Sequence, residues 1–185
     1  ESVAEFIDID LDESSPRLPS AADLEALPLL ISAALPIGLD VTGCATIAGN
    51  STSLQQAVES CEWDVEIRGV EPAAAAGAVD RVLAADDLTI TRQRKGKDVT
   101  DDVRPYVLAL AVVGSTDGGT RVHAHLATQP RGLRVSELLA LLDPTWDEGL
   151  VRRTAQWTLI DGARHEPLEG PVEATSTSHA TARAS

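Results

Sequence analysis

Alternating apolar and polar residues predict several strands along the chain. The alternation is clearest at residues 62–68, where Trp63, Val65 and Ile67 fall on one face and charged residues on the other. This pattern is typical of a strand with one buried and one solvent-facing side. The run at 106–113 is almost entirely apolar, which predicts a strand covered on both faces. Further strands are predicted at residues 3–11, 39–48, 88–94, 120–128 and 151–161.

Helices are predicted where apolar residues recur every three or four positions between capping and breaking residues. Ser20 is a suitable N-cap for a helix that runs toward Leu35. Pro72 suits the first turn of a helix at 73–85, because the first turn does not need the amide that proline lacks. The segment Asp117-Gly118-Gly119 predicts a hairpin turn between two strands. Shorter helices are predicted at 54–60 and 136–142.

The order of these elements predicts an α+β fold with antiparallel sheets. From Glu62 onward it reads strand, helix, strand, strand, strand, helix, strand, which indicates a ferredoxin-like (split βαβ) unit with one additional strand. The strand, helix and strand before it match the remainder of a similar unit truncated at its N-terminus. We therefore expect tandem ferredoxin-like units. Their predicted ranges are 1–50 for the C-terminal half of the first unit, 51–165 for the second, and 166–185 for a disordered tail.

Composition narrows the class of protein. The 185 residues are 43% hydrophobic and carry a net charge of -14, as expected for a soluble globular protein that binds neither membrane nor DNA. The longest apolar runs fall well short of the ~20 residues of a spanning helix. Cys44 and Cys61 lack the spacing of a disulfide framework or a zinc site. They are interpreted as two small buried side chains in a reducing cytoplasm.

A short basic run stands out against this acidic background. Arg92, Arg94, Lys95 and Lys97 lie within six residues, and both lysines of the chain flank Gly96. One interpretation is a site for phosphate, RNA backbone or an acidic partner, because glycine lets a backbone amide approach an anion. The other is a solvated hairpin tip, balanced by nearby aspartates. Asp102 and Arg104 would share one strand face and could pair there.

Two further sets of residues are weighed as catalytic or metal-binding candidates. His123 and His125 share one face of the strand at 120–128 and could ligate a metal or act as a general base. Nothing in the sequence completes a triad around them. Asp8, Asp10 and Asp12 would lie about 7 Å apart along a strand, too far to share one ion. We therefore assign no catalytic residue, no metal and no cofactor.

Several short motifs, taken in order, resemble a known family. The most specific is Lys95-Gly96-Lys97 followed by Asp102-Val103-Arg104-Pro105. Together the motifs resemble the C-terminal three-quarters of the radical SAM-linked domain of unknown function, over residues 1–161. The family's N-terminal helical segment is missing, so we expect an incomplete N-terminus, and Val135 stands where proline is usual. The remaining motifs are Glu5–Ile9, Ala34–Leu39, Arg134–Leu139 and Arg153-Thr154.

The resemblance implies a bacterial protein that acts beside a radical SAM enzyme. Members of the family occur alone or fused to such an enzyme with a cobalamin-type domain, and separate copies are often encoded near ribonuclease E/G and ribosomal protein genes. Their fold is similar in outline to RNA-processing repeat-associated endonucleases, with tandem ferredoxin-like units. Their functional residues are not established, so the resemblance transfers none.

These observations predict a non-catalytic accessory module rather than an enzyme. A radical SAM enzyme needs three closely spaced cysteines for its cluster, and this chain has two that lie far apart. We expect a cytoplasmic partner of a radical SAM protein that positions an RNA or ribosome-associated substrate. The alternatives are an RNA-processing or RNA-binding protein, with His123 or His125 as general base, and a structural scaffold domain. The predicted contact residues are Arg92, Arg94, Lys95, Gly96, Lys97, Asp102 and Arg104.

Overall fold

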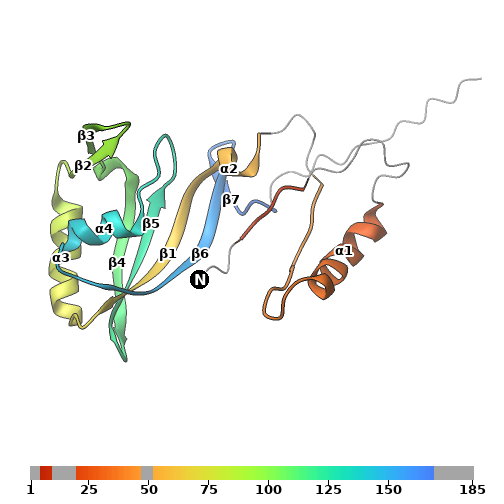
Figure 1. Cartoon of the computed structure of the whole chain (residues 1–185), viewed down its shortest axis with the longest axis horizontal. Coiled ribbons are helices and arrows are strands. Elements are labelled where there is room, and N and C mark those ends of the chain that lie inside the picture. The colour runs from red at the N-terminus through yellow and green to blue at the C-terminus, as the bar shows by residue number, and fades with distance from the viewer. Residues whose placement is uncertain (1–4, 10–19, 47–51, 169–185) are drawn as a thin grey trace, which may run out of the picture. The chain divides into compact units, whose positions relative to one another are not determined.

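A computed structural model describes residues 5–9, 20–46 and 52–168 (Figure 1). The chain divides into two compact units. Unit 1 comprises residues 1–8 and 53–167, and unit 2 comprises residues 9–52 and 168–185. The fold is mixed α+β with antiparallel sheets, as the sequence predicts. None of the helices in the described ranges combines the length and the apolar character that crossing a bilayer requires.

Unit 1 contains the sheets and the helices that pack on them. A five-stranded antiparallel sheet has the order β4-β5-β1-β6-β7, so β1 is its central strand. The pair β2 and β3 forms a separate two-stranded sheet. The elements are α2 (Leu54–Ala57), β1 (Val58–Arg68), α3 (Pro72–Ala84), β2 (Thr89–Arg94), β3 (Lys97–Asp102), the short 3₁₀ helix η1 (Arg104–Tyr106), β4 (Val107–Thr116), β5 (Gly119–Ala127), α4 (Val135–Leu142), β6 (Glu148–Ile160) and β7 (Ala163–His165).

One face of the five-stranded sheet packs against α3 and α4. The alternation at 62–68 places Val65 and Ile67 of β1 on this buried face. Small and branched residues of α3, such as Ala78 and Val82, allow the helix to approach the sheet closely. Leu138 of α4 is also buried in the same core. The core of unit 1 therefore lies between one sheet face and two helices, and the opposite face of the sheet carries the polar residues.

Unit 2 contains the helix α1 (Ala21–Ala34). The predicted N-cap is confirmed, since the Ser20 hydroxyl accepts a hydrogen bond from the Asp23 amide at 3.2 Å. The Asp23 carboxylate in turn accepts from the Ser20 amide at 2.8 Å, which completes a capping box. Pro28 lies inside the helix. The Ser32 hydroxyl donates to the Pro28 carbonyl at 2.7 Å and accepts from the Val41 amide at 2.8 Å, which ties the following segment to the helix.

Two strand predictions near the N-terminus are wrong at the residues that the structure describes. Residues 5–9 and 39–46 form no strand. An alternating sequence becomes a strand only when a neighbouring strand pairs with its backbone, and within the described residues neither segment has such a partner. The prediction of tandem ferredoxin-like units is therefore not confirmed. The predicted tail lies almost wholly outside the described residues, as do parts of both segments.

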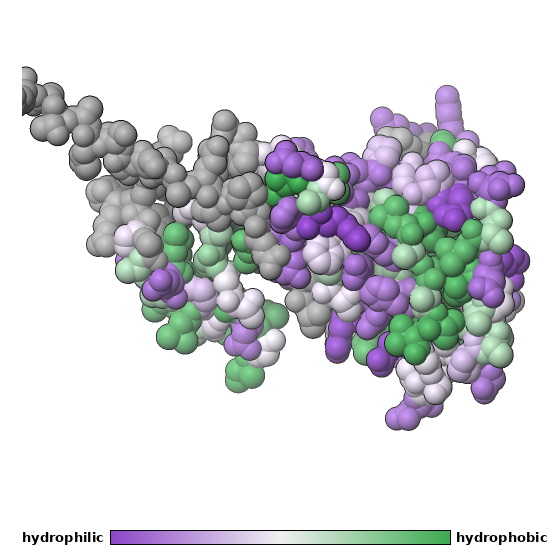
Figure 2. All heavy atoms as spheres, turned by 180° about the vertical axis from the view of Figure 1, so that it is seen from behind, coloured by the Kyte–Doolittle hydropathy of each residue, from purple (hydrophilic) through white to green (hydrophobic). Residues whose placement is uncertain are grey.

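Three further features differ from the prediction. The helix expected at 54–60 ends at Ala57, because β1 already begins at Val58. The segment Lys97–Asp102 forms the strand β3, although its polar sequence gave no strand signal. The strand β4 is an edge strand, and it is covered on one face only, with Leu108 49% and Val113 61% exposed. Apolar side chains gather on the surface of the part of the molecule that contains the five-stranded sheet (Figure 2).

Candidate functional site

The basic run forms the tip of the hairpin of β2 and β3. The strands pair from Thr89 opposite Asp102 to Arg94 opposite Lys97, which leaves a two-residue turn at Lys95 and Gly96. These two residues have φ values of 52° and 75°, as a type I′ turn requires. Gly96 therefore has a conformational role whether or not an anion binds.

The predicted contact residues at the tip are open to solvent. Lys95, Gly96 and Lys97 are all exposed. Within the described ranges, no carboxylate forms an ion pair with either lysine. The Arg94 backbone belongs to β2, and its side chain lies outside the described part of the structure.

Asp102 closes the base of the hairpin. One oxygen of its carboxylate, Oδ1, accepts hydrogen bonds from the Leu88 amide at 2.8 Å and the Arg104 amide at 3.0 Å. These two bonds, led by that from Leu88, hold the pKa of Asp102 below its usual range. The Val103 amide also donates to the Leu88 carbonyl at 2.7 Å, and the Val103 side chain is fully buried. The two ends of the hairpin are thereby held together.

Arg104 joins the hairpin to the end of α3. Its guanidinium donates from Nη2 to the Leu83 carbonyl at 3.0 Å and from Nε to the Ala85 carbonyl at 3.1 Å. It also donates from Nη1 to the Val107 carbonyl at 3.0 Å. The last carbonyls of a helix lack partners within it, and a cation there is favoured by the helix dipole. The motif from Asp102 to Arg104 therefore has a structural role.

Arg92 is linked to α4 through a short series of charged residues. Its Nη2 lies 3.2 Å from Oδ2 of Asp101, and the same oxygen lies 3.5 Å from Nε of Arg131. Arg131 also contacts Glu137, in the first turn of α4, with 2.6 Å between Nη2 and Oε1. The charge of Arg92 is thus balanced within the protein. Among the predicted contact residues whose side chains the structure describes, residues 95–97 at the exposed hairpin tip are those least engaged by the fold.

The open face of the five-stranded sheet carries a second polar cluster. The β1–β5 register places Glu62 opposite His125 and Asp64 opposite His123. His123 lies between the two carboxylates, with Nδ1 3.0 Å from Asp64 Oδ1 and Nε2 3.6 Å from Glu62 Oε2. Glu62 also accepts a hydrogen bond from Trp157 Nε1 at 2.9 Å. Both ring nitrogens of His123 face carboxylates, so neither presents a free lone pair to a substrate.

His125 forms a hydrogen bond with Ser60 in a buried position. Its Nε2 lies 2.8 Å from Ser60 Oγ, and its Nδ1 lies 3.3 Å from Nη1 of Arg164. Arginine only donates, so Nδ1 must accept, and the proton of the neutral ring is on Nε2. Burial, helped by Arg164, lowers the pKa of His125, which favours this neutral ring. Nε2 therefore donates to Ser60 and is not placed to remove the serine proton, as a general base would.

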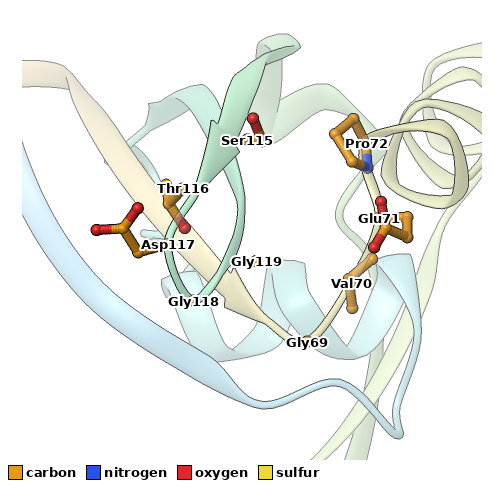
Figure 3. Close-up of a pocket in the computed structure, with 9 residues that line it drawn as sticks. All are labelled: Gly69, Val70, Glu71, Pro72, Ser115, Thr116, Asp117, Gly118 and Gly119. Atoms are coloured by element: carbon orange, nitrogen blue, oxygen red, sulfur yellow. The ribbon is translucent and has the colours of Figure 1, made fainter.

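A small pocket lies where the loop between β1 and α3 meets the turn between β4 and β5 (Figure 3). Its volume is about 270 Å³, and it is lined by residues 69–72 and 115–119. The loop and the turn are joined by a 2.8 Å hydrogen bond from the Gly69 amide to the Gly118 carbonyl. A Cβ at Gly119 would lie 2.0 Å from the Ile67 carbonyl oxygen. Glycine at position 119 thus lets the two backbone segments pack closely, and the pocket is the space left between the loop and the turn.

The remaining candidates give no metal site in the described ranges. No group of three or more histidine, cysteine, aspartate or glutamate side chains is placed there to hold an ion. Cys61 is buried and Cys44 is half-buried, and both are free thiols. Burial raises the pKa of Cys61. Asp8 accepts a hydrogen bond from the Leu54 amide at 2.8 Å, whereas Asp10 and Asp12 lie outside the described residues.

Sequence reasoning found the histidine pair but missed its surroundings. Ser60 and His125 are 65 residues apart, and they meet only because of the register between β1 and β5. Arg164 reaches His125 from β7, a three-residue strand without a clear pattern. The local signal of this cluster in the sequence is the spacing of His123 and His125, which places both on one face of the predicted strand.

A comparison with protein families finds a match over most of the chain. The family model described as "Uncharacterized protein conserved in bacteria (DUF2344)" matches residues 1–136, which is more than half of the chain. Neither the curated proteins nor the solved structures include a match. The matched range includes the strands β1 to β5 of unit 1, and with them the basic hairpin and the motif from Asp102 to Arg104. The chain belongs to this family of uncharacterised proteins conserved in bacteria.

Proposed function

We propose that this chain is a non-catalytic accessory module that works with a radical SAM enzyme and holds an RNA substrate at the tip of the β2–β3 hairpin. The observation that carries the proposal is the exposed turn Lys95-Gly96-Lys97, which contains both lysines of the chain. The link to a radical SAM enzyme and to RNA is supported by the resemblance of the lysine turn and the motif after it to the radical SAM-linked domain.

The construction of the hairpin supports a binding role for its tip. Asp102 and Arg104 fix its base by five hydrogen bonds between them and the neighbouring backbone. A loop that is already ordered loses less conformational entropy when it binds a partner. The lysines, by contrast, are exposed and have no ion pair in the described part of the chain. The fold thus presents the two charges on a fixed support.

The net charge of the protein sets the expected strength of this contact. At -14 the protein as a whole repels a polyanion, so binding depends on the local charge of the tip. Each phosphate neutralised on a single strand contributes about 0.7 to the slope of log affinity against log salt. Two lysine contacts therefore correspond to a slope of about 1.4. We expect weak binding at high salt.

The geometry of the histidines favours this function over RNA cleavage. His123 faces two carboxylates, and Nε2 of His125 donates to Ser60. A general base must instead present a lone pair to the proton that it removes.

The order of elements also supports a ferredoxin-like fold for unit 1. The chain runs β1, α3, β4, β5, α4, β6, and the strands lie side by side in the order β4-β5-β1-β6 with antiparallel neighbours. This is the arrangement of the split βαβ unit. The β2–β3 hairpin is then an insertion between α3 and β4, and β7 is an addition at the edge.

Fluorescence anisotropy with a short labelled single-stranded RNA tests RNA binding. The variant Lys95→Ala/Lys97→Ala should bind more weakly and show a salt slope lower by about 1.4. The matched control Arg68→Ala/Arg121→Ala removes the same number of charges from exposed positions elsewhere in unit 1. It should retain most of the affinity. Equal losses in both variants, or no loss in the lysine variant, would reject the proposed contact.

Association with the enzyme needs a separate measurement. Mixed with a purified radical SAM enzyme from the same bacterium, the chain should elute with it in size-exclusion chromatography. Separate elution at micromolar concentrations would reject the accessory role, whatever the RNA result.

A further inference from the structure

A hollow of about 450 Å³ lies on unit 1, at the end of the open sheet face where β1 and β4 begin and β5 ends. Its lining combines charged, polar and apolar side chains from several strands. The residues are Glu59, Ser60, Leu108, His125, Ala127, Gln129, Leu159 and Arg164. None of them belongs to the hairpin that the proposed function uses.

The floor of the hollow contains a buried donor without an acceptor. Ser60 is 4% exposed and His125 is 8% exposed. Since Nε2 of His125 donates to Ser60 Oγ, the hydrogen of the serine hydroxyl is left to donate elsewhere. No acceptor for it is present in the described part of the protein. A buried donor left unpaired costs about 1–3 kcal/mol, so an acceptor in the hollow would be favoured.

Arg164 places a cation beside this donor. Its guanidinium carbon lies 5.8 Å from the centre of the Trp157 ring, and Nη1 donates to His125. These contacts orient the guanidinium but use few of its five N–H groups. Within the described ranges, no carboxylate lies within ion-pair distance of Arg164. The remaining N–H groups are available to an anionic ligand, and a carboxylate matches their geometry.

The walls limit the shape and charge of a ligand. Leu108 and Leu159 are 49% and 55% exposed, and with Ala127 they offer apolar surface. A ligand with an apolar body would remove this surface from water. Glu59 also lines the hollow, and its negative charge disfavours a doubly charged anion such as a phosphate ester. A single negative charge fits these groups best.

We propose that this hollow binds a small monocarboxylate with an apolar body, whose carboxylate accepts hydrogen bonds from Ser60 Oγ and the Arg164 guanidinium. The apolar body lies against Leu108, Ala127 and Leu159. His125 acts as a positioning residue, because it receives a hydrogen bond from Arg164 and directs the Ser60 hydroxyl toward the ligand.

Titration with 4-methylpentanoate, followed by the tryptophan indole signals in ¹H–¹⁵N NMR spectra of the full chain, tests this site. The Trp157 indole signal should shift, because its ring lies against Arg164. Trp63 contacts Arg153 instead and serves as an internal control, which should not shift. The amine 4-methylpentylamine has a similar apolar body and the opposite charge, so it should not bind. Absence of a Trp157 shift at millimolar 4-methylpentanoate, or equal binding of the amine, would overturn the proposal.

Variants separate the donor from the apolar wall. Ser60→Ala removes one hydrogen bond to a charged group, worth about tenfold in affinity. The control Ser115→Ala changes an exposed serine at the other end of the sheet and should leave the affinity unchanged. Leu159→Ala alters a half-exposed residue, so it should fold normally and still weaken binding. Unchanged affinity in both Ser60→Ala and Leu159→Ala would show that the ligand binds at another site and would overturn the proposal. Lys95→Ala/Lys97→Ala should leave carboxylate binding intact, which makes this test independent of the RNA proposal.

Discussion

Replacing Arg104 by alanine should destabilise the protein strongly, although the residue lies in the motif predicted to bind a partner. Its guanidinium donates to three backbone carbonyls, those of Leu83, Ala85 and Val107. A hydrogen bond contributes about 0.5–1.5 kcal/mol to stability, and bonds from a charged donor lie at the upper end or above. The side chain is half-buried, so water can replace part of what is lost. We therefore expect a loss of about 2–4 kcal/mol, a large part of a typical total of 5–15 kcal/mol.

Urea unfolding followed by tryptophan fluorescence measures this loss. Arg104→Lys keeps the charge, but an ammonium group cannot reach three separated carbonyls in the same way, so most of the loss should remain. The variant Lys95→Ala/Lys97→Ala, in the exposed turn, should change the free energy of unfolding by less than about 0.5 kcal/mol. A loss below about 0.5 kcal/mol for Arg104→Ala would refute the assignment of a structural role to this side chain.

Three other predictions follow from local geometry. Gly119→Ala would place a Cβ 2.0 Å from the Ile67 carbonyl oxygen at a φ of 155°, so it should cost about 3 kcal/mol or more in urea unfolding, whereas Gly77→Ala in α3 meets open space and should stabilise by about 0.5–1 kcal/mol. A Gly119→Ala protein as stable as the wild type would show that the turn is not so tight. Because the folded-state pKa of Asp102 is lowered, its contribution to stability is present above the unfolded pKa of about 4 and is lost as the pH falls through the folded pKa. Asp102→Asn should therefore show a smaller acid-induced loss in urea midpoint than the wild type, and equal losses would contradict this. The pKa of His125 is lowered by burial, so NMR titration should find the ring still neutral, with its proton on Nε2, at pH values just below the usual 6.5. A proton on Nδ1 would contradict the hydrogen bonds assigned to it.

Local signals in the sequence were enough for most elements of unit 1, but not for β3 and β7. The alternation at 62–68, Pro72 in a first turn and the turn at 117–119 all correspond to observed features. These signals depend on backbone preferences that operate within a few residues. The strand β3 gave no such signal, because its polar sequence forms a strand only through pairing with β2. The converse holds at 39–46, where an alternating segment that pairs with no strand of the described structure remains irregular.

The candidate site was predictable to a smaller extent. The charge pattern located the lysine turn, since two lysines around a glycine are unusual in an acidic chain. The charge pattern could not show that Lys95 and Lys97 are exposed whereas Arg104 has a structural role. That role depends on the position of the end of α3, whose carbonyls Arg104 contacts. The hollow at Ser60 could not be predicted from the sequence either, because its residues come together only through the strand register.

Binding of RNA by the two lysines of the β2–β3 tip is tested by its salt dependence, measured by anisotropy for the wild type, Lys95→Ala/Lys97→Ala and Arg68→Ala/Arg121→Ala. We expect a slope lower by about 1.4 for the lysine variant alone, with its stability unchanged. Equal slopes for the wild type and the lysine variant would show that the exposed tip makes no contact with phosphate, and would reject the proposed RNA site.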